Sequence, residues 1–160
     1  MLGARKVAMQ ATTGLAGDWF AALKADHKLV DGLFKVLLET SEDETAKRQL
    51  LFSKIVYALA KHQFEEEHVI YPALLAGGRA ETPKHLASEH FEMKSLMHSL
   101  SEMAKDDPRW LGTARGLHKL IGEHVREEEE IVFPALQARL TARENAHLTR
   151  AMHREGLKLA

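Results

Sequence analysis

Residues 62–74, HQFEEEHVIYPAL, and residues 124–136, HVREEEEIVFPAL, are the two stretches of this 160-residue chain that decide its fold. They lie at an offset of 62 residues and share a first histidine, a run of glutamates and a Pro-Ala-Leu ending. A second repeat pairs His27 and two leucines after it with His90 and its two leucines, at an offset of 63 residues. The sequence therefore predicts a duplicated helical hairpin with pseudo-two-fold symmetry.

Helix-forming residues dominate the chain, which indicates an all-α protein. Ala, Leu, Glu, Lys and Met are frequent, β-branched residues are few, and no stretch alternates cleanly between apolar and polar residues. Residues that commonly cap helix N-termini, two of them followed directly by proline, mark the helix starts. The expected starts are Asp18, Ser41, Thr82, Asp107 and Thr141, and Gly77-Gly78 is expected to end the second helix.

The connections between the expected helices are short, which implies antiparallel neighbours. The expected architecture is an up-down-up-down antiparallel four-helix bundle with an extra C-terminal helix. Its expected parts are an N-terminal extension at 1–17, the bundle at 18–138 and the C-terminal helix at 139–160. The last helix either caps the bundle or mediates dimerisation, so both a monomer and a homodimer stay open.

Apolar residues at steps of three and four predict the core face, or seam, of each of the four helices. The expected seam positions are Phe20, Leu23, His27, Val30, Phe34 and Leu37; Phe52, Ile55, Leu59, His62, Glu66, Val69 and Ala73; Leu86, His90, Met93, Met97 and Leu100; and Ala114, Leu117, Ile121, His124, Glu128, Ile131 and Ala135. One histidine interrupts each apolar stripe, and a glutamate follows one turn later on the second and fourth helices.

The spacing His-x3-Glu puts an imidazole and a carboxylate on one face of a helix, about 5 to 6 Å apart at their Cβ atoms. The chain contains this spacing four times, beginning at His62, His85, His98 and His124. Only the pairs that begin at His62 and His124 lie on the seam. The candidate metal ligands are the six polar seam residues: His27, His62, Glu66, His90, His124 and Glu128.

Four imidazoles and two carboxylates in an apolar interior need a compensating charge. An unpaired buried carboxylate costs several kcal/mol even after the protein relaxes. A pair of divalent or trivalent metal ions supplies this charge, with imidazoles as terminal ligands and carboxylates as bridges. The chain has ten histidines and no cysteine, which excludes thiolate zinc sites and iron–sulfur clusters. Imidazole and carboxylate together suit iron, manganese or zinc.

Charge and hydropathy argue against several other classes of function. The formal net charge is −1, from 22 Lys plus Arg and 23 Asp plus Glu, so we expect no nucleic-acid partner. No segment approaches the roughly 20 apolar residues of a membrane-spanning helix. The start of the chain also lacks the continuous apolar stretch of a signal peptide. We therefore expect a cytoplasmic protein with no membrane partner.

The order and spacing of the six polar seam residues, together with the repeated Pro-Ala-Leu sequences, resemble the hemerythrin-like family, also called the HHE cation-binding domain. The resemblance covers roughly residues 18–138 and implies a non-haem centre of two iron ions, oxo- or hydroxo-bridged. Oxygen, peroxide or nitric oxide would bind at an open iron position. The family pattern implies bridging roles for Glu66 and Glu128, and terminal pairs of His27 with His62 and of His90 with His124.

Two departures from the oxygen-carrying members shape the expected function. Those members have a second histidine one turn after the position of His90, where this chain has Lys94. Their last ligand motif is His-x4-Asp, whereas this chain has His-x3-Glu. The match is closer to members with two His-x3-Glu motifs. We therefore expect a di-iron protein that binds or reacts with small oxidants (O2, peroxide, NO) in a stress, sensing or detoxification role. Whether it also turns over, as a weak catalase-like enzyme, stays open.

Three other functions remain as alternatives. An iron storage or donation protein, or an oxygen-binding protein without turnover, would use the same ligands. A ferritin-like carboxylate oxidase needs Glu-x-x-His on two helices. The two instances here begin at Glu65 and Glu144, off the seam or outside the bundle, and so argue against it. The last alternative is a helical bundle that binds no metal and only mediates interactions.

Residues near the seam are candidates for supporting roles, with packing or solvent exposure as the competing explanation for each. The candidates for additional iron ligands, besides water, are Tyr57, Tyr71, Glu65 and Glu129, and the two glutamates are also candidates for accepting hydrogen bonds from ligands. The candidates for orienting imidazole N–H groups are Asp26, Asp31, Glu89 and Glu123. The residues Glu67, Glu127 and Glu130 are expected on a solvated acidic face. Pro72 and Pro134 are expected to kink or end their helices just past the glutamates.

Overall fold

The computed structural model describes residues 17–78 and 80–159. The expected N-terminal extension therefore lies outside the described residues, apart from Gly17. No strand forms within these two ranges, and helices account for most of them, so the expected all-α class is confirmed. None of the helices in this part of the chain combines the length and the apolar character needed to cross a membrane.

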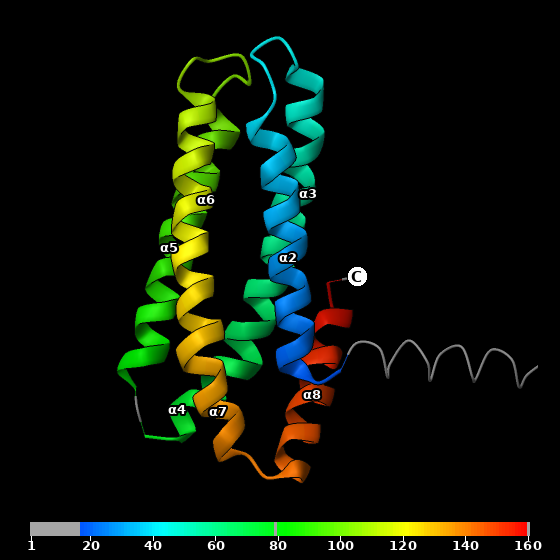
Figure 1. The fold of residues 1–160 in the computed structure, drawn as a ribbon, viewed down its shortest axis with the longest axis vertical. Coiled ribbons are helices and arrows are strands. Elements are labelled where there is room, and N and C mark those ends of the chain that lie inside the picture. The colour runs from blue at the N-terminus through cyan, green and yellow to red at the C-terminus, as the bar shows by residue number, and fades with distance from the viewer. Residues whose placement is uncertain (1–16, 79, 160) are drawn as a thin grey trace, which may run out of the picture.

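Four long helices lie side by side and form the body of the molecule (Figure 1). They are α2 (Trp19–Leu38), α3 (Thr45–Glu65), α5 (Glu81–Glu102) and α6 (Trp110–Glu127). The most extensive contacts between helices join α2 to α3 and α5 to α6, so the chain forms two consecutive hairpins. Contacts between α2 and α6 then hold one hairpin against the other.

The second helix of each hairpin passes through a five-residue π-helical turn. The first π turn, η1 (Glu66–Ile70), leads into α4 (Tyr71–Ala76), and the second, η2 (Glu128–Val132), leads into α7 (Phe133–Arg139). In each turn a backbone N–H bonds to the carbonyl five residues earlier, as Tyr71 does to Glu66.

Proline explains the position of each π turn. Pro72 and Pro134 each stand two residues after the last residue of the turn, at the second position of the next helix segment. Proline lacks an N–H and its ring crowds the carbonyl four residues earlier, so a widened turn accommodates it. The expected kink or end of the helix is therefore a π turn through which the helix continues.

The π turns shift the core register by one residue, which corrects part of the expected seam. Ile131 is 66% exposed, and Ala135 is also exposed, although both were expected in the core. Their neighbours Val132 and Leu136 are buried instead. In the first hairpin Ala73 is only half-buried, whereas Leu74 is buried. Each extra residue in a turn rotates everything after it, so a constant 3.6-residue period predicts the wrong positions.

Two apolar clusters fill the interior, and the polar seam residues lie between them. The first cluster contains Trp19, Leu23 and Val69, and the second contains Val30 and Leu59. Because each histidine follows the apolar residues of one cluster and precedes those of the other along its helix, the histidines form a layer across the bundle. Met97, expected in the seam, is only partly buried against the second cluster.

The C-terminal helix α8 (Ala142–Leu157) packs on the end of the bundle nearest α4 and α7. Its Leu148 and Met152 belong to the first apolar cluster. The Trp19 Nε1–H also donates a hydrogen bond to Asn145 Oδ1 at 2.7 Å. Of the two roles expected for this helix, the contacts within the chain support capping.

The helix starts agree with the expected caps at two places. Asp18 accepts a hydrogen bond from the Ala21 N–H and caps α2, and Thr141 forms a capping box with Glu144 at the start of α8. The other three helices begin within a few residues of the expected starts, at Thr45, Glu81 and Trp110. The helix formed by α3, η1 and α4 ends before Gly77-Gly78, as expected, and Gly78 has a φ of 86°, a conformation that favours glycine.

Candidate metal centre

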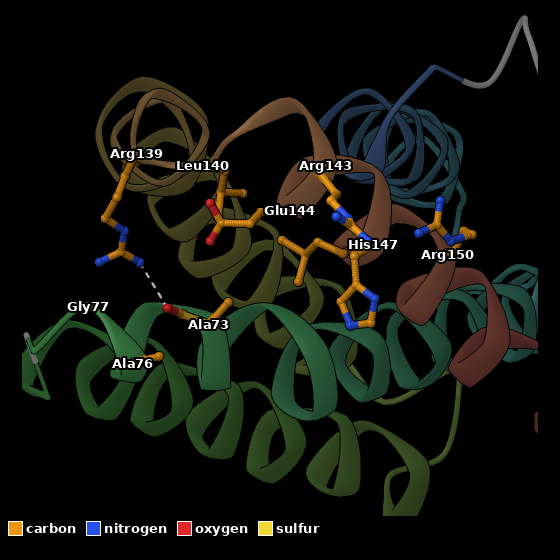
Figure 2. A pocket seen from close by; sticks show the side chains of 10 residues that line it. Ala73, Ala76, Gly77, Arg139, Leu140, Arg143, Glu144, His147 and Arg150 are labelled. Carbon is orange, nitrogen blue, oxygen red and sulfur yellow. Dashed lines mark hydrogen bonds between the residues drawn. The ribbon is translucent and has the colours of Figure 1, made fainter.

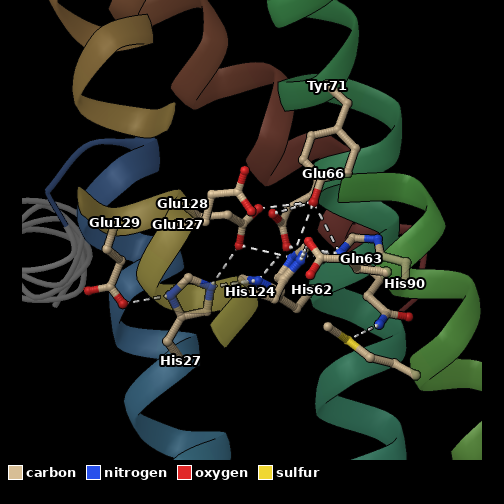
Figure 3. A network of polar contacts seen from close by, with 12 residues as sticks. His27, His62, Gln63, Glu66, Tyr71, His90, His124, Glu127, Glu128 and Glu129 are labelled. Carbon is tan, nitrogen blue, oxygen red and sulfur yellow. Dashed lines mark hydrogen bonds and ion pairs between the residues drawn. The ribbon is translucent and has the colours of Figure 1, made fainter. Parts of the chain in front are cut away.

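The four helices bring all six expected ligand residues into one buried layer (Figure 3). The exposed fraction of each is 8% or less, and it is 0% for Glu66 and Glu128. The four histidines come one from each long helix, and the two glutamates begin the two π turns. The layer is therefore assembled from both hairpins, and neither hairpin contains it alone.

The histidines form two pairs through their Nε2 atoms. The Nε2 atoms of His27 and His62 lie 3.0 Å apart, and those of His90 and His124 lie 3.1 Å apart. Each pair is contained within one hairpin, because α2 contacts α3 and α5 contacts α6. The two pairs therefore offer two neighbouring positions, each with two ring nitrogens.

The two glutamates connect the pairs. Glu66 Oε1 lies 2.5 Å from His62 Nε2 and 3.8 Å from His90 Nε2. Glu128 Oε1 lies 3.2 Å from His124 Nε2 and 3.5 Å from His27 Nε2. Each carboxylate thus faces one histidine of its own hairpin and one of the other. This is the placement that a carboxylate bridging two cations requires.

A carboxylate outside the layer faces the second ring nitrogen, Nδ1, of every histidine. The pairs are Asp26 with His62 at 3.2 Å, Glu89 with His124 at 3.1 Å, Glu129 with His27 at 2.9 Å and Glu67 with His90 at 3.0 Å. When Nδ1–H donates to such a carboxylate, the Nε2 lone pair is directed inward. All four histidines are thereby oriented as metal ligands.

Sequence reasoning found three of these four carboxylates. Asp26 and Glu89 were candidates for orienting imidazoles, and Glu129 was a candidate for a ligand or an orienting group. Glu67 was assigned to the solvated face, which is wrong because it accepts from His90 and from Lys94 Nζ at 3.2 Å. The internal repeat carried the missing signal, since Glu67 and Glu129 occupy equivalent positions.

Four other candidates lie away from the layer. Asp31 forms ion pairs at 2.8 Å with both Lys35 and His118, and Glu123 is exposed. Tyr57 is 57% exposed, and its hydroxyl contacts only the Leu159 carbonyl, at 3.4 Å, among the described residues. Glu65 is buried beside α8 and lies 3.8 Å from Lys61. Their side chains point away from the layer because they lie off the seam.

Tyr71 is the one tyrosine that reaches the layer. Its hydroxyl lies 3.1 Å from Glu66 Oε2, 2.9 Å from Glu128 Oε2 and 3.1 Å from His90 Nε2. Burial and the two carboxylates raise its pKa far above the ordinary value, so the hydroxyl remains protonated and donates. Packing was the favoured expectation for this side chain, but it also contributes a polar atom to the site.

The two glutamates share one proton when no cation lies between them. Burial and the adjacent Glu128 carboxylate raise the pKa of Glu66 to about 8. Burial acts in the same direction on Glu128, but hydrogen bonds from Glu66, His124 and His27 outweigh it and keep its pKa well below the ordinary value. Two adjacent buried carboxylates cannot both ionise without a positive partner.

The donor set fits a pair of cations. With neutral imidazoles and every Nδ1–H directed at a carboxylate, the paired Nε2 atoms face each other with lone pairs and cannot hydrogen-bond. In this neutral state the buried Oε1 atoms of Glu66 and Glu128 have no hydrogen-bond donor among the described residues. Two groups of converging ligand atoms result: His27, His62, Glu66 and Glu128 in one, and Glu66, His90 and His124 in the other.

A small cavity of about 20 Å³ adjoins the imidazoles. It is lined by all four histidines and by apolar side chains of the second cluster, including Val30 and Ile121. Gln63 contributes an amide group to the lining. The Gln63 Oε1 atom is buried without a hydrogen-bond partner in the described part of the chain. The volume is enough for one molecule about the size of water.

A third group of potential ligands lies at the surface. His85 Nε2 lies 3.4 Å from Glu89 Oε1 and 3.2 Å from Glu127 Oε2. The His85 side chain is 56% exposed, and ordinary surface ion pairing accounts for the group. It differs from the buried layer because water already solvates its charges.

Comparison with known proteins agrees with this geometry. The model of the Hemerythrin HHE cation binding domain family matches residues 20–136. The chain is 28% identical over 120 residues to a DNA nickase of Nostoc sp., covering 75% of this chain and 34% of that protein. It is 25% identical over 139 residues to an uncharacterized hemerythrin-like protein of Schizosaccharomyces pombe, covering 83% of this chain and 66% of that protein. The chain thus spans about a third of the first relative and about two thirds of the second.

A solved structure has the same fold. The crystal structure of a hemerythrin HHE cation binding domain-containing protein from Mycobacterium kansasii superposes with a TM-score of 0.78 at 22% identity, covering 89% of this chain and 86% of that chain. The family match includes the buried histidine and glutamate layer from His27 to Glu128. Because the family model spans most of the chain, the protein belongs to the hemerythrin HHE cation-binding domain family.

Proposed function

We propose that this protein is a non-haem di-iron protein that reacts with small oxidants such as peroxide, oxygen or nitric oxide. The observation that carries the proposal is the pair of two-histidine positions connected by Glu66 and Glu128. Two such positions side by side support two metal ions rather than one. The proposal includes the up-down-up-down order of the four long helices, which the contacts between consecutive helices support.

In this proposal each ion is held by the histidines of one hairpin, and both glutamates bridge. The ligands of the first ion are His27 and His62, and those of the second are His90 and His124. Iron suits a set of imidazole and carboxylate donors without thiolate, and it supplies the redox chemistry that small oxidants require. The outer carboxylates hold each imidazole in the ligand orientation.

The size of the cavity supports a small reaction partner. Its volume of about 20 Å³ admits one diatomic molecule or one water-sized group, and its lining is largely apolar. Besides the imidazoles, the amide of Gln63 and the carboxylate of Asp26 are polar groups in its lining. The side chains of this chain therefore select for size and exclude bulk water from the imidazoles.

The absence of a fifth histidine supports turnover over stable oxygen carriage. Lys94 is exposed and its ammonium contacts Glu67, so this position supplies no nitrogen ligand to the layer. Tyr71 instead places a protonated hydroxyl between Glu66 and Glu128. The hydroxyl stays protonated in this place, so it can donate a hydrogen bond that stabilises negative charge developing on a group bound next to the carboxylates.

The test begins with metal analysis and an absorption spectrum of the protein after gentle purification, with and without azide. We expect close to two irons per chain and a spectrum that azide changes. The iron-loaded protein should then consume peroxide or bind nitric oxide. A stable, reversible oxygen adduct with no peroxide consumption would instead support oxygen binding without turnover. Release of the iron to a chelator with no reaction toward oxidants would support storage or donation.

A further inference from the structure

A separate cleft lies between α4, α7 and α8, away from the histidine layer (Figure 2). Its volume is about 700 Å³, within the range of roughly 300 to 1,000 Å³ typical of small-molecule sites. The cleft is formed where the C-terminal helix meets the ends of the two hairpins. The proposed reaction with small oxidants makes no use of it.

One side of the cleft is apolar. Ala73 and Ala76 of α4 line it. Leu140 lies across the cleft from them, beside Arg139 and Glu144 (Figure 2), and the buried Leu148 also contributes to the lining. Small alanine side chains on α4 leave room between this helix and α8. An organic ring or short chain placed here would exclude water from these four residues.

The other side of the cleft is basic. Arg139, Arg143, His147 and Arg150 line it, and the acidic residue among its lining is Glu144. The Glu144 carboxylate already accepts from the Thr141 N–H in the capping box of α8. None of the three arginines forms an ion pair within 4 Å among the described residues, although the charge of Arg139 acts on Glu144. The cleft therefore gathers three guanidinium groups and one imidazole around a single carboxylate, on a chain whose net charge is −1.

Arg139 is held in position at the edge of the cleft. Its Nη2–H donates to the Ala73 carbonyl at 2.8 Å, as the dashed line in Figure 2 marks. A Cβ atom at Gly77 would overlap the Arg139 guanidinium, so glycine is needed for the arginine to lie across the end of α4. A guanidinium fixed in this way loses little side-chain entropy when it binds an anion.

We propose that this cleft binds a small organic phosphate of about mononucleotide size. The phosphate contacts the basic side, since planar guanidinium groups match phosphate oxygens in charge and geometry. The organic part lies on Ala73, Ala76, Leu140 and Leu148. Several guanidinium groups favour a phosphate over a carboxylate, because a phosphate monoester carries close to two negative charges and a carboxylate carries only one.

Calorimetric titration of the metal-loaded full chain with AMP, ATP, pyrophosphate and adenosine tests the proposal. We expect AMP and ATP to bind more tightly than adenosine and more tightly than pyrophosphate. The double variant R143Q/R150Q should weaken nucleotide binding by about tenfold or more for each arginine. The matched control is R154Q, which removes the same charge from an exposed position of α8 outside the cleft.

A second variant separates the apolar side from the charge. A76W fills the cleft from an exposed position on α4 and leaves every arginine in place, so it should abolish nucleotide binding while helix content and metal content stay unchanged. Failure of both nucleotides to bind would overturn the proposal. Equal binding of pyrophosphate and ATP would also overturn it, because the apolar side would contribute nothing.

Titration with a short single-stranded oligonucleotide distinguishes binding of a nucleic-acid backbone from binding of a mononucleotide. Oligonucleotide binding that falls steeply with salt and survives A76W would place phosphates on the helix surface rather than in the cleft, and would overturn the proposal. Mononucleotide binding that is lost in A76W and R143Q/R150Q but retained in R154Q would support it. These measurements do not depend on the reaction with oxidants, so each proposal can fail separately.

Discussion

The two hairpins present the same polar groups to the layer but differ in their surroundings. Each contributes two histidines, one of the two central glutamates and two outer carboxylates at equivalent sequence positions. In the first hairpin, Tyr71 adds a hydroxyl to the layer. The equivalent Phe133 has no polar atom and packs against Trp19 and Phe20, with ring centroids 5.4 and 5.6 Å apart.

The C-terminal helix makes a second difference between the hairpins. It packs on the first hairpin beside Glu65 and contacts it so closely that a Cβ atom at Gly156 would clash with the Glu65 carboxylate. The equivalent Glu127 of the second hairpin is instead half-exposed and contacts the exposed His85. Duplication therefore accounts for the histidines and glutamates of the layer. The unduplicated α8 and one Tyr-to-Phe difference make the two proposed metal positions unequal.

The strongest way to break the comparison is to remove a bridge. We expect E66A and E128A each to lose most of the second metal ion, because each carboxylate faces both histidine pairs. Metal analysis by mass spectrometry measures this. The matched control E130A removes an exposed glutamate from the same acidic run. Wild-type metal content in both bridge variants would be incompatible with the assigned centre.

The pH dependence of stability is the next largest effect, and it should differ between the metal-free and the metal-loaded forms. Burial acts to lower the pKa of His124, but the hydrogen bond and charge of Glu128 outweigh it and raise the pKa to about 9. The stabilisation from this protonated histidine is complete below its unfolded pKa near 6.5 and is lost as the pH rises through about 9. The raised pKa of Glu66, about 8, acts in the same direction, because its protonated form is favoured in the folded state.

Metal binding removes this dependence above pH 6.5, because the cations keep the ligands deprotonated in the folded state. Between pH 6.5 and 9 we therefore expect the melting temperature of the metal-free protein to fall and metal affinity to rise. Thermal unfolding of both forms at several pH values, together with calorimetry in buffers of different ionisation enthalpy to count released protons, measures the effect. Parallel pH profiles of the two forms would contradict it.

The outer carboxylates test whether the hairpins are equivalent. We expect D26N and E89Q each to weaken metal binding by roughly 10 to 100-fold, because each loses the group that orients a histidine. Competition against a chelator of known affinity measures the two values. Asp31 provides the control, since D31N removes a carboxylate that contacts Lys35 and His118 rather than the layer. Similar losses of metal affinity in the two variants would show that the two hairpins hold their histidines equally well, although α8 packs on the first hairpin alone.

The smallest effect comes from making the hairpins alike at one position. Y71F removes the hydroxyl that contacts both bridging glutamates, and we expect it to keep both metals and to lower the free energy of unfolding by about 1 to 3 kcal/mol. The absorption spectrum and the rate of peroxide consumption should change as well. Urea unfolding and stopped-flow absorbance measure these effects. An unchanged spectrum and an unchanged rate would limit Tyr71 to a packing role.

The sequence was sufficient to predict the all-helical class and the convergence of the six polar seam residues, because a polar residue that interrupts an apolar stripe is a strong signal. It was insufficient after each glutamate, where the π turn adds a residue and a constant helical period misplaces Ile131 and Ala135. Glu67 was missed for a related reason, since its position looks solvent-facing until the turn rotates it toward His90.

The two π turns also bear on the ancestry of the chain. A π turn is equivalent to the insertion of one residue into an α-helix, and both hairpins carry it between a glutamate and a Pro-Ala-Leu sequence at equivalent positions. Two independent insertions at the same place are less economical than one insertion followed by duplication. The simplest history is therefore a single hairpin that acquired its extra residue first and was copied afterwards. A symmetric pair of such hairpins would already have supplied four imidazoles and two carboxylates.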